Sequence, residues 1–160
     1  MFPVKSPASQ EKPSKLKRIL VPVNGNIADE DAINLACEIA RKTRASIFVV
    51  YIIEVTRSLP LDAVVQAELS KAEQILTRAE DIASEMDYEI KTDLIQAREA
   101  GVAIVDEAIE KEMDLIIMGL EYKKRFGRFN LGEAVTYVLE ESPCRVLLLR
   151  RPIPGRSRKK

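Results

Sequence analysis

Five short apolar segments alternate along the chain with stretches whose apolar residues recur every three or four positions. The segment at residues 47–53 is apolar throughout, which is typical of a strand covered on both faces. The segment at residues 88–94 instead alternates apolar with charged residues, as a less buried edge strand does. These patterns predict strands over residues 19–23, 47–53, 88–94, 115–118 and 146–149.

The segments between these strands have the periodicity of amphipathic helices. The longest has one apolar stripe that runs from Val65 to Met86 at spacings of three and four. Ser58 and Pro60 indicate that this helix starts near residue 58, because serine caps helices and proline is favoured in the first turn. The predicted helices cover residues 32–40, 58–86, 102–109 and 132–141.

Strict alternation of strands and helices predicts an α/β fold. Each strand must pair in parallel with another through a right-handed helical crossover, which places helices on both faces of the sheet. We therefore predict one doubly wound, five-stranded parallel sheet of order 3-2-1-4-5 with four helices. The alternating strand at residues 88–94 lies at one edge of this sheet, and the strand at residues 146–149 lies at the other.

The two ends of the chain differ from the rest in composition and charge. Residues 1–16 are rich in Pro, Ser and Lys without periodicity, and we expect a flexible leader there, a folded domain over residues 17–151 and a basic flexible tail over residues 152–160. The formal net charge is +0, yet both ends are basic, so the domain between them is acidic. An acidic domain argues against nucleic acid as a partner, because phosphate contacts need a positive face.

Composition excludes several kinds of chemistry. The chain has no histidine, which removes Ser-His-Asp and Cys-His nucleophile systems and His-ligated zinc. Its two cysteines, Cys37 and Cys144, form neither a metal cluster nor a disulfide framework. We interpret the acidic runs at residues 29–31 and 140–141 as solvated helix faces and expect no metal site and no catalytic residue. Without an apolar signal segment or a membrane-spanning run, we expect a cytoplasmic protein.

The predicted topology suggests where a ligand would bind. In doubly wound sheets, ligands lie beyond the carboxyl ends of the strands, where the winding reverses. Here that point brings together the loop after the first strand, at residues 24–26, and the loop that begins at Gly119. A helix N-terminus near Gly132 faces the same crevice, and such termini attract anions. A nucleotide or phosphate site is the resulting hypothesis.

Several motifs, in order, resemble the universal stress protein family over residues 17–150. Residues 19–25, ILVPVNG, are similar to that family's first strand and turn, VPVDGS, and Val50-Tyr51-Ile52 to its LHV. Residues 114–119, DLIIMG, are similar to its DLIVMG signature, and the end of the domain at residues 137–147 is similar to its YVLRHAPCPVLVV. The resemblance implies an adenine-nucleotide alpha-hydrolase-like fold and a homodimer formed by antiparallel pairing of last strands.

Family members that bind ATP carry Gly-x2-Gly-x9-Gly-Ser/Thr after the fourth strand, and this chain departs from that pattern. It keeps Gly119 and Gly132 but has Tyr122 and Glu133 at the other two positions, and Asn24 where the family usually has aspartate. Tyr122 disfavours positive φ, and Glu133 supplies a resident anion at the helix start. The candidate nucleotide-binding residues of this degenerate crevice are Val23, Asn24, Ile52, Met118, Gly119, Tyr122, Gly132 and Glu133.

Basic residues crowd the loop that would cover a phosphate: Lys123, Lys124, Arg125 and Arg128. They are either simply solvated, or they neutralise Glu133, bind another anion, or hold a ligand differently from the family's usual mode. These alternatives stay open.

The sequence therefore predicts a non-catalytic stress-response homodimer that acts through an unidentified protein partner; it fixes no cofactor and leaves ATP as the candidate. The alternative is a member that senses ATP or another adenine nucleotide. An enzyme of related layout lacks support, because the chain has no GxxxxGK[ST] loop, no SGGxDS loop and no HIGH motif. The apolar last strand is an edge that invites pairing across a two-fold axis, and the candidate interface comprises Arg145, Val146, Leu147, Leu148 and Leu149.

Overall fold

A computed structural model describes residues 15–122, 124–125, 128–129, 131–153 and 155–156 of the chain. The predicted leader therefore falls outside the described residues except for residues 15 and 16, and so do residues 154 and 157–160 of the predicted tail. The strands are β1 (Arg18–Val23), β2 (Ser46–Glu54), β3 (Ile90–Ala97), β4 (Leu115–Leu120), β5 (Lys124–Arg125), β6 (Arg128–Phe129) and β7 (Arg145–Arg150). The helices are α1 (Ala28–Thr43), α2 (Gln66–Glu85), α3 (Ala100–Glu110) and α4 (Glu133–Glu141).

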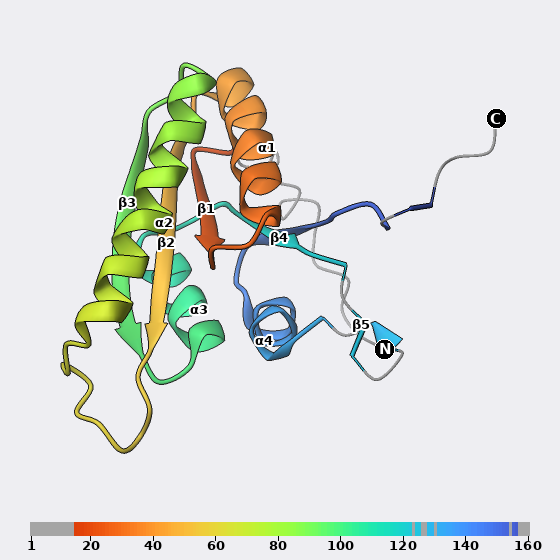
Figure 1. Cartoon of the computed structure of the whole chain (residues 1–160). Coiled ribbons are helices and arrows are strands. Elements are labelled where there is room, and N and C mark those ends of the chain that lie inside the picture. Colours follow the sequence, from red (N-terminus) through yellow and green to blue (C-terminus); the bar gives the residue numbers. More distant parts are fainter. Residues whose placement is uncertain (1–14, 123, 126–127, 130, 154, 157–160) are drawn as a thin grey trace, which may run out of the picture.

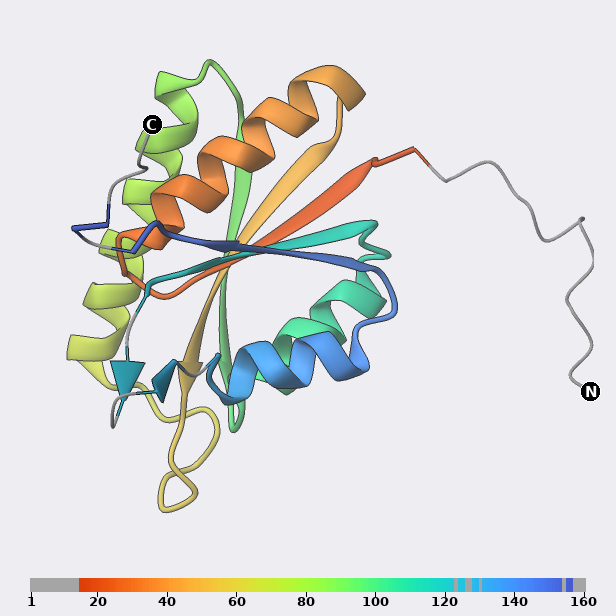
Figure 2. The same cartoon turned by 90° about the vertical axis from the view of Figure 1, so that its right-hand side faces the viewer.

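Five strands form one parallel sheet in the order β3-β2-β1-β4-β7, which confirms the predicted order 3-2-1-4-5. β1 and β4 occupy the centre, where Leu20 and Ile116 are fully buried. Helices α1 and α2 cover one face of the sheet, and α3 and α4 cover the other (Figure 1, Figure 2). Every strand except the edges is thereby buried on both faces, as the unbroken apolar runs predicted.

Along each strand, successive side chains point alternately into one of two separate hydrophobic cores. Ile19, Val21 and Val23 of β1 join the core beneath α1 and α2, whereas Leu20 joins the core beneath α3 and α4. At the far end of the sheet, the Asp114 carboxylate accepts hydrogen bonds of 2.9 Å from the backbone N–H groups of Lys17 and Arg18. The first residue of the DLIIMG motif therefore stabilises the start of β1, far from the predicted crevice.

Helix α2 begins at Gln66, so the predicted start near Ser58 is wrong. The Nη1 of Arg98 donates hydrogen bonds to the backbone carbonyls of Thr56, at 2.6 Å, and of Leu59, at 2.9 Å. Gln96 Nε2 similarly donates to the carbonyl of Ala63 at 2.7 Å. These side chains, from the end of β3 and the residue after it, hold the segment between β2 and α2 as a loop rather than as the start of the helix.

Two further boundaries differ from the prediction. β3 runs from Ile90 to Ala97 rather than over residues 88–94, because Asp87 turns the chain with a φ of 54° and the Tyr88 hydroxyl donates to the Ala45 carbonyl. The basic stretch after β4, predicted as a loop, contains the antiparallel hairpin of β5 and β6. Within the described ranges, we find no helix that combines the length and the apolar character needed to cross a bilayer.

Candidate functional site

A crevice with a volume of about 600 Å³ opens at the carboxyl ends of β1 and β4, beside the N-terminus of α4. The topology predicted a site at this place. Seven of the eight candidate residues line it, whereas Tyr122 is outside the lining that the described residues form. The candidates in the lining are Val23, Asn24, Ile52, Met118, Gly119, Gly132 and Glu133.

The loop between β1 and α1 is held by its own asparagine side chains. The Asn24 Oδ1 accepts a hydrogen bond of 3.1 Å from the backbone N–H of Asn26. The Asn26 Oδ1 in turn accepts one of 2.8 Å from the backbone N–H of Ala28 at the start of α1. Since its oxygen is engaged within the loop, Asn24 has mainly its amide N–H groups to offer a ligand.

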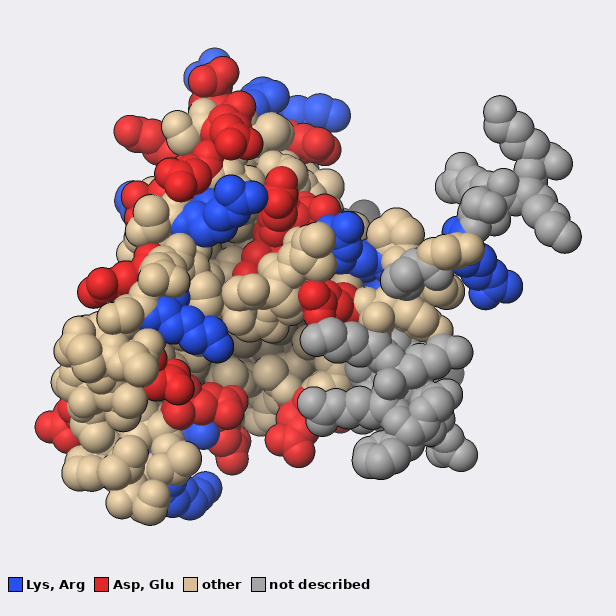
Figure 3. Space-filling view, viewed as in Figure 1, with Lys and Arg blue, Asp and Glu red and all other residues tan. Residues whose placement is uncertain are grey.

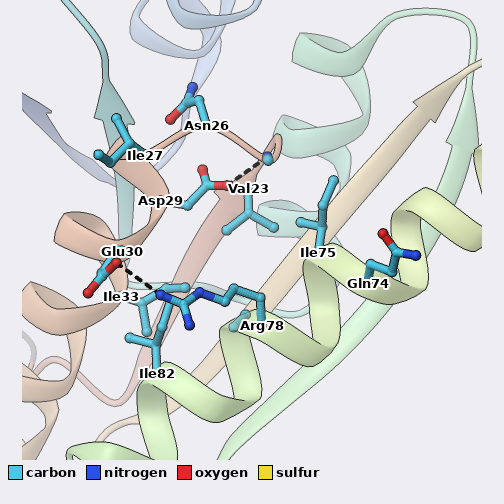
Figure 4. A pocket seen from close by; sticks show the side chains of 12 residues that line it. Val23, Asn26, Ile27, Asp29, Glu30, Ile33, Gln74, Ile75, Arg78 and Ile82 are labelled. Atoms are coloured by element: carbon cyan, nitrogen blue, oxygen red, sulfur yellow. Dashed lines mark hydrogen bonds and ion pairs between the residues drawn. The ribbon is translucent and has the colours of Figure 1, made fainter.

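Asp29, in the first turn of α1, reaches back into the same loop (Figure 4). Its Oδ2 accepts hydrogen bonds from the backbone N–H groups of Gly25 at 2.7 Å and Asn24 at 3.2 Å. Burial raises the pKa of this carboxyl to about 6; these hydrogen bonds oppose the rise, and the nearby Glu121 charge adds to it. Sequence reasoning missed this residue, because an acidic run in a first helical turn is ordinarily a solvated face.

Gly119 has a packing role at the base of the crevice. A Cβ at this position would lie 2.3 Å from the backbone carbonyl oxygen of Ala28, closer than real contacts allow. Gly119 therefore lets the start of α1 approach β4. Gly132 differs, because a Cβ there would meet no atom within 4 Å, but its φ of 85° lies in the left-handed region that favours glycine.

Glu133 is the first residue of α4, and its exposed side chain lines the crevice. A carboxylate is favoured there by the helix dipole, and it occupies the position where an incoming phosphate would be attracted. Glu121, at the end of β4, lines the same crevice with a second carboxylate. The ring of Tyr122 instead lies under the guanidinium of Arg150, at 5.3 Å from the ring centroid.

A second cavity, of about 420 Å³, lies behind the β1–α1 loop between α1 and α2. Its walls are mainly apolar, with Ile33 from α1 and Ile75 and Ile82 from α2 (Figure 4). Arg78 and Glu30 form an ion pair of 3.3 Å across it. Asp29 lines both this cavity and the crevice, so the two spaces share its carboxyl as a wall.

Figure 3 shows how charged side chains are distributed over one face of the molecule. Acidic and basic side chains are interspersed over the face that α1 and α2 form (Figure 3). Among the described residues, no group of three or more His, Cys, Asp or Glu side chains is arranged to hold a metal ion. The crevice brings together polar and charged side chains from the β1–α1 loop, the end of β4 and the start of α4.

The last strand, the predicted dimer edge, pairs with β4 alone among the described strands. Val146 and Leu148 pack into the core beneath α3 and α4, whereas the Leu147 side chain points to the other face and is 37% exposed. Among the apolar candidate interface residues, Leu147 is thus the one whose side chain is most exposed to solvent.

Comparison with known proteins places this architecture in a family. The family model described as the universal stress protein family matches residues 15–150. Universal stress protein MJ0531 of Methanocaldococcus jannaschii is 28% identical over 142 residues, which cover 85% of this chain and 83% of the relative.

Solved structures agree in fold at lower identity. A universal stress protein from Archaeoglobus fulgidus has a TM-score of 0.72 and 21% identity, covering 82% of this chain and 97% of that one. A structure of the universal stress protein from the same organism in complex with dAMP has a TM-score of 0.68 and 19% identity, covering 84% and 98%. The match of the family model over nearly the whole domain shows that the chain belongs to the universal stress protein family.

Proposed function

We propose that this protein is a non-catalytic stress-response regulator, active as a homodimer through protein contacts, with a degenerate nucleotide crevice. The observation that carries the proposal is the carboxylate of Glu133 at the first residue of α4, on the wall of the crevice. A phosphate drawn to that helix start would meet a resident negative charge. Two like charges about 4 Å apart repel by roughly 1 kcal/mol in bulk water and about 4 kcal/mol near a protein surface.

Tyr122 contributes in a different way from Glu133. Because its ring contacts Arg150 and does not line the crevice, it opposes a phosphate through the backbone of the loop, where a glycine would allow a closer approach. We therefore place the main obstacle to ATP at Glu133.

A titration of ATP into the purified chain and into Glu133→Ser tests this function. The unmodified chain should bind ATP weakly or not at all, and the variant should gain about 1–4 kcal/mol, or roughly five- to thousand-fold in affinity. Glu141→Ser, at the opposite end of α4, is the matched control and should change nothing. Weak binding that Glu133→Ser leaves unimproved would contradict the role of Glu133.

The second candidate function is a sensor of adenine nucleotides. It is supported by the volume of the crevice, about 600 Å³, and by its apolar wall of Ile52, Ile104 and Met118, which suits a flat base. The dAMP complex of the relative from Archaeoglobus fulgidus has the same fold. Micromolar binding of an adenine nucleotide by the unmodified chain, or its presence after purification, would favour the sensor over the first candidate.

The open edge of β7 supports the proposed homodimer. Among the described strands, β7 is an edge strand that pairs with β4 alone, and its exposed Leu147 favours pairing with a second copy across a two-fold axis. Light scattering at tens of micromolar should give a mass of about twice the 18.0 kDa of one chain. The monomer mass at that concentration would overturn the dimer.

A further inference from the structure

Asp29 stands apart from the neighbouring acids of α1 in how its charge is balanced. Glu30 pairs with Arg78 of α2, and Asp31 pairs with Arg151 after β7 at 3.0 Å. In the described part of the chain, no Lys or Arg pairs with Asp29, whose carboxylate is held by backbone N–H groups alone. Its negative charge is therefore the least compensated of the three.

Asp29 also lines the space that a ligand would occupy. Asp29 lines the crevice and also lines the cavity between α1 and α2, where Figure 4 shows it. The crevice is also lined by Glu121, directly after β4, and by Glu133 at the start of α4. An anion that enters the crevice therefore meets carboxylates from three separate elements, and uptake of one proton would relieve part of the repulsion.

Few groups of this protein can supply that relief near neutral pH. The chain has no histidine, the side chain whose ordinary pKa lies in this range. Its lysines and arginines, including those at residues 123–128, belong to types that ordinarily stay charged from about pH 5 to about pH 7.5. Burial raises the pKa of Asp29 to about 6, so this carboxyl can accept a proton in the range from about pH 5 to about pH 7.5.

We propose that Asp29 takes up a proton when an anionic ligand occupies the crevice, so that affinity for the ligand rises as the pH falls. The proposal rests on the second candidate function, the sensor of adenine nucleotides, and gives that site a sensitivity to acidification. By linkage, a bound anion that raises the Asp29 pKa by one unit would bind about five- to tenfold more tightly at about pH 5 than at about pH 7.5.

Calorimetric titration with cyclic AMP and with adenosine tests the proposal. Cyclic AMP carries one phosphodiester charge that stays constant over this pH range, and adenosine is the uncharged counterpart. We expect cyclic AMP to bind several-fold more tightly at the lower pH, with net proton uptake measured from buffers of different ionisation enthalpy. Adenosine should bind about equally at both pH values.

Two variants separate Asp29 from its neighbours. Asp29→Asn, which carries no charge at either pH, should bind cyclic AMP with the same affinity at both and without proton uptake. Asp31→Asn, one of the neighbouring acids with an arginine partner, is the matched control and should keep the pH dependence. An Asp29→Asn variant that keeps the pH dependence would overturn the proposal.

The outcomes also distinguish this proposal from the nucleotide function beneath it. Cyclic AMP that binds equally at both pH values, without proton uptake, would overturn the role of Asp29 and leave nucleotide binding intact. Binding of neither ligand at either pH would overturn the nucleotide function and the proton linkage together.

Discussion

Replacing Asp29 by Asn should change how the stability of this protein depends on pH. The pKa of Asp29 is raised from 3.8 to about 6, chiefly by burial. Between these two values the folded state binds more protons than the unfolded state. The contribution to stability is therefore fully present below about pH 3.8 and is lost as the pH rises through about 6.

The size of the effect follows from the shift of the pKa. One unit corresponds to 1.36 kcal/mol, so the ionised Asp29 costs the folded state about 3 kcal/mol at pH values well above 6. Roughly half of this cost appears between pH 5 and pH 7.5. Asp29→Asn removes the charge, but it also weakens the hydrogen bonds from the Gly25 and Asn24 N–H groups. The weaker hydrogen bonds should destabilise the folded variant by about 1–2 kcal/mol.

Urea unfolding at several pH values, compared between the unmodified chain and the variant, measures the effect. The difference in unfolding free energy should move by about 1–2 kcal/mol in favour of Asp29→Asn between pH 5 and pH 7.5. Asp62→Asn makes the same chemical change at an exposed loop position and should show no such trend. If the difference in unfolding free energy between Asp29→Asn and the unmodified chain stays constant with pH, the raised pKa of Asp29 in the folded state is refuted.

Two further predictions concern packing and assembly. Gly119→Ala should lower the unfolding free energy by about 1–3 kcal/mol, because its Cβ would meet the Ala28 carbonyl at 2.3 Å. Gly132→Ala should also cost about 1–3 kcal/mol, here through a backbone conformation (φ 85°, ψ 158°) that is essentially confined to glycine, and chemical denaturation that finds either variant as stable as the unmodified chain would contradict its assignment. Leu147→Lys should weaken the proposed dimer in sedimentation experiments, whereas Ile109→Lys, a substitution at an exposed site on α3, should not; equal effects would argue against the β7 edge.

The sequence determined the architecture because the architecture depends on periodicity. The continuous apolar runs at residues 19–23 and 115–118 specify strands that are buried on both faces. Because helices separate the strands along the chain, the strands must form a doubly wound parallel sheet. The position of the crevice follows from the same order, since β1 and β4 flank the reversal of winding. Seven of the eight candidate residues line that crevice for this reason.

Only the tertiary structure decided the properties that depend on distant partners. Helix α2 starts at Gln66 because Arg98, more than thirty residues further along the chain, binds the carbonyls of the preceding loop. Gly119 is needed because Ala28 of another element approaches it, which no local pattern indicates. Asp29 has the same kind of short-range sequence context as Asp31, yet the fold places the half-buried Asp29 on the walls of two cavities, which raises its pKa, and gives Asp31 an arginine partner. Periodicity records which face of an element is apolar, whereas burial of one charge depends on what the rest of the chain packs against it.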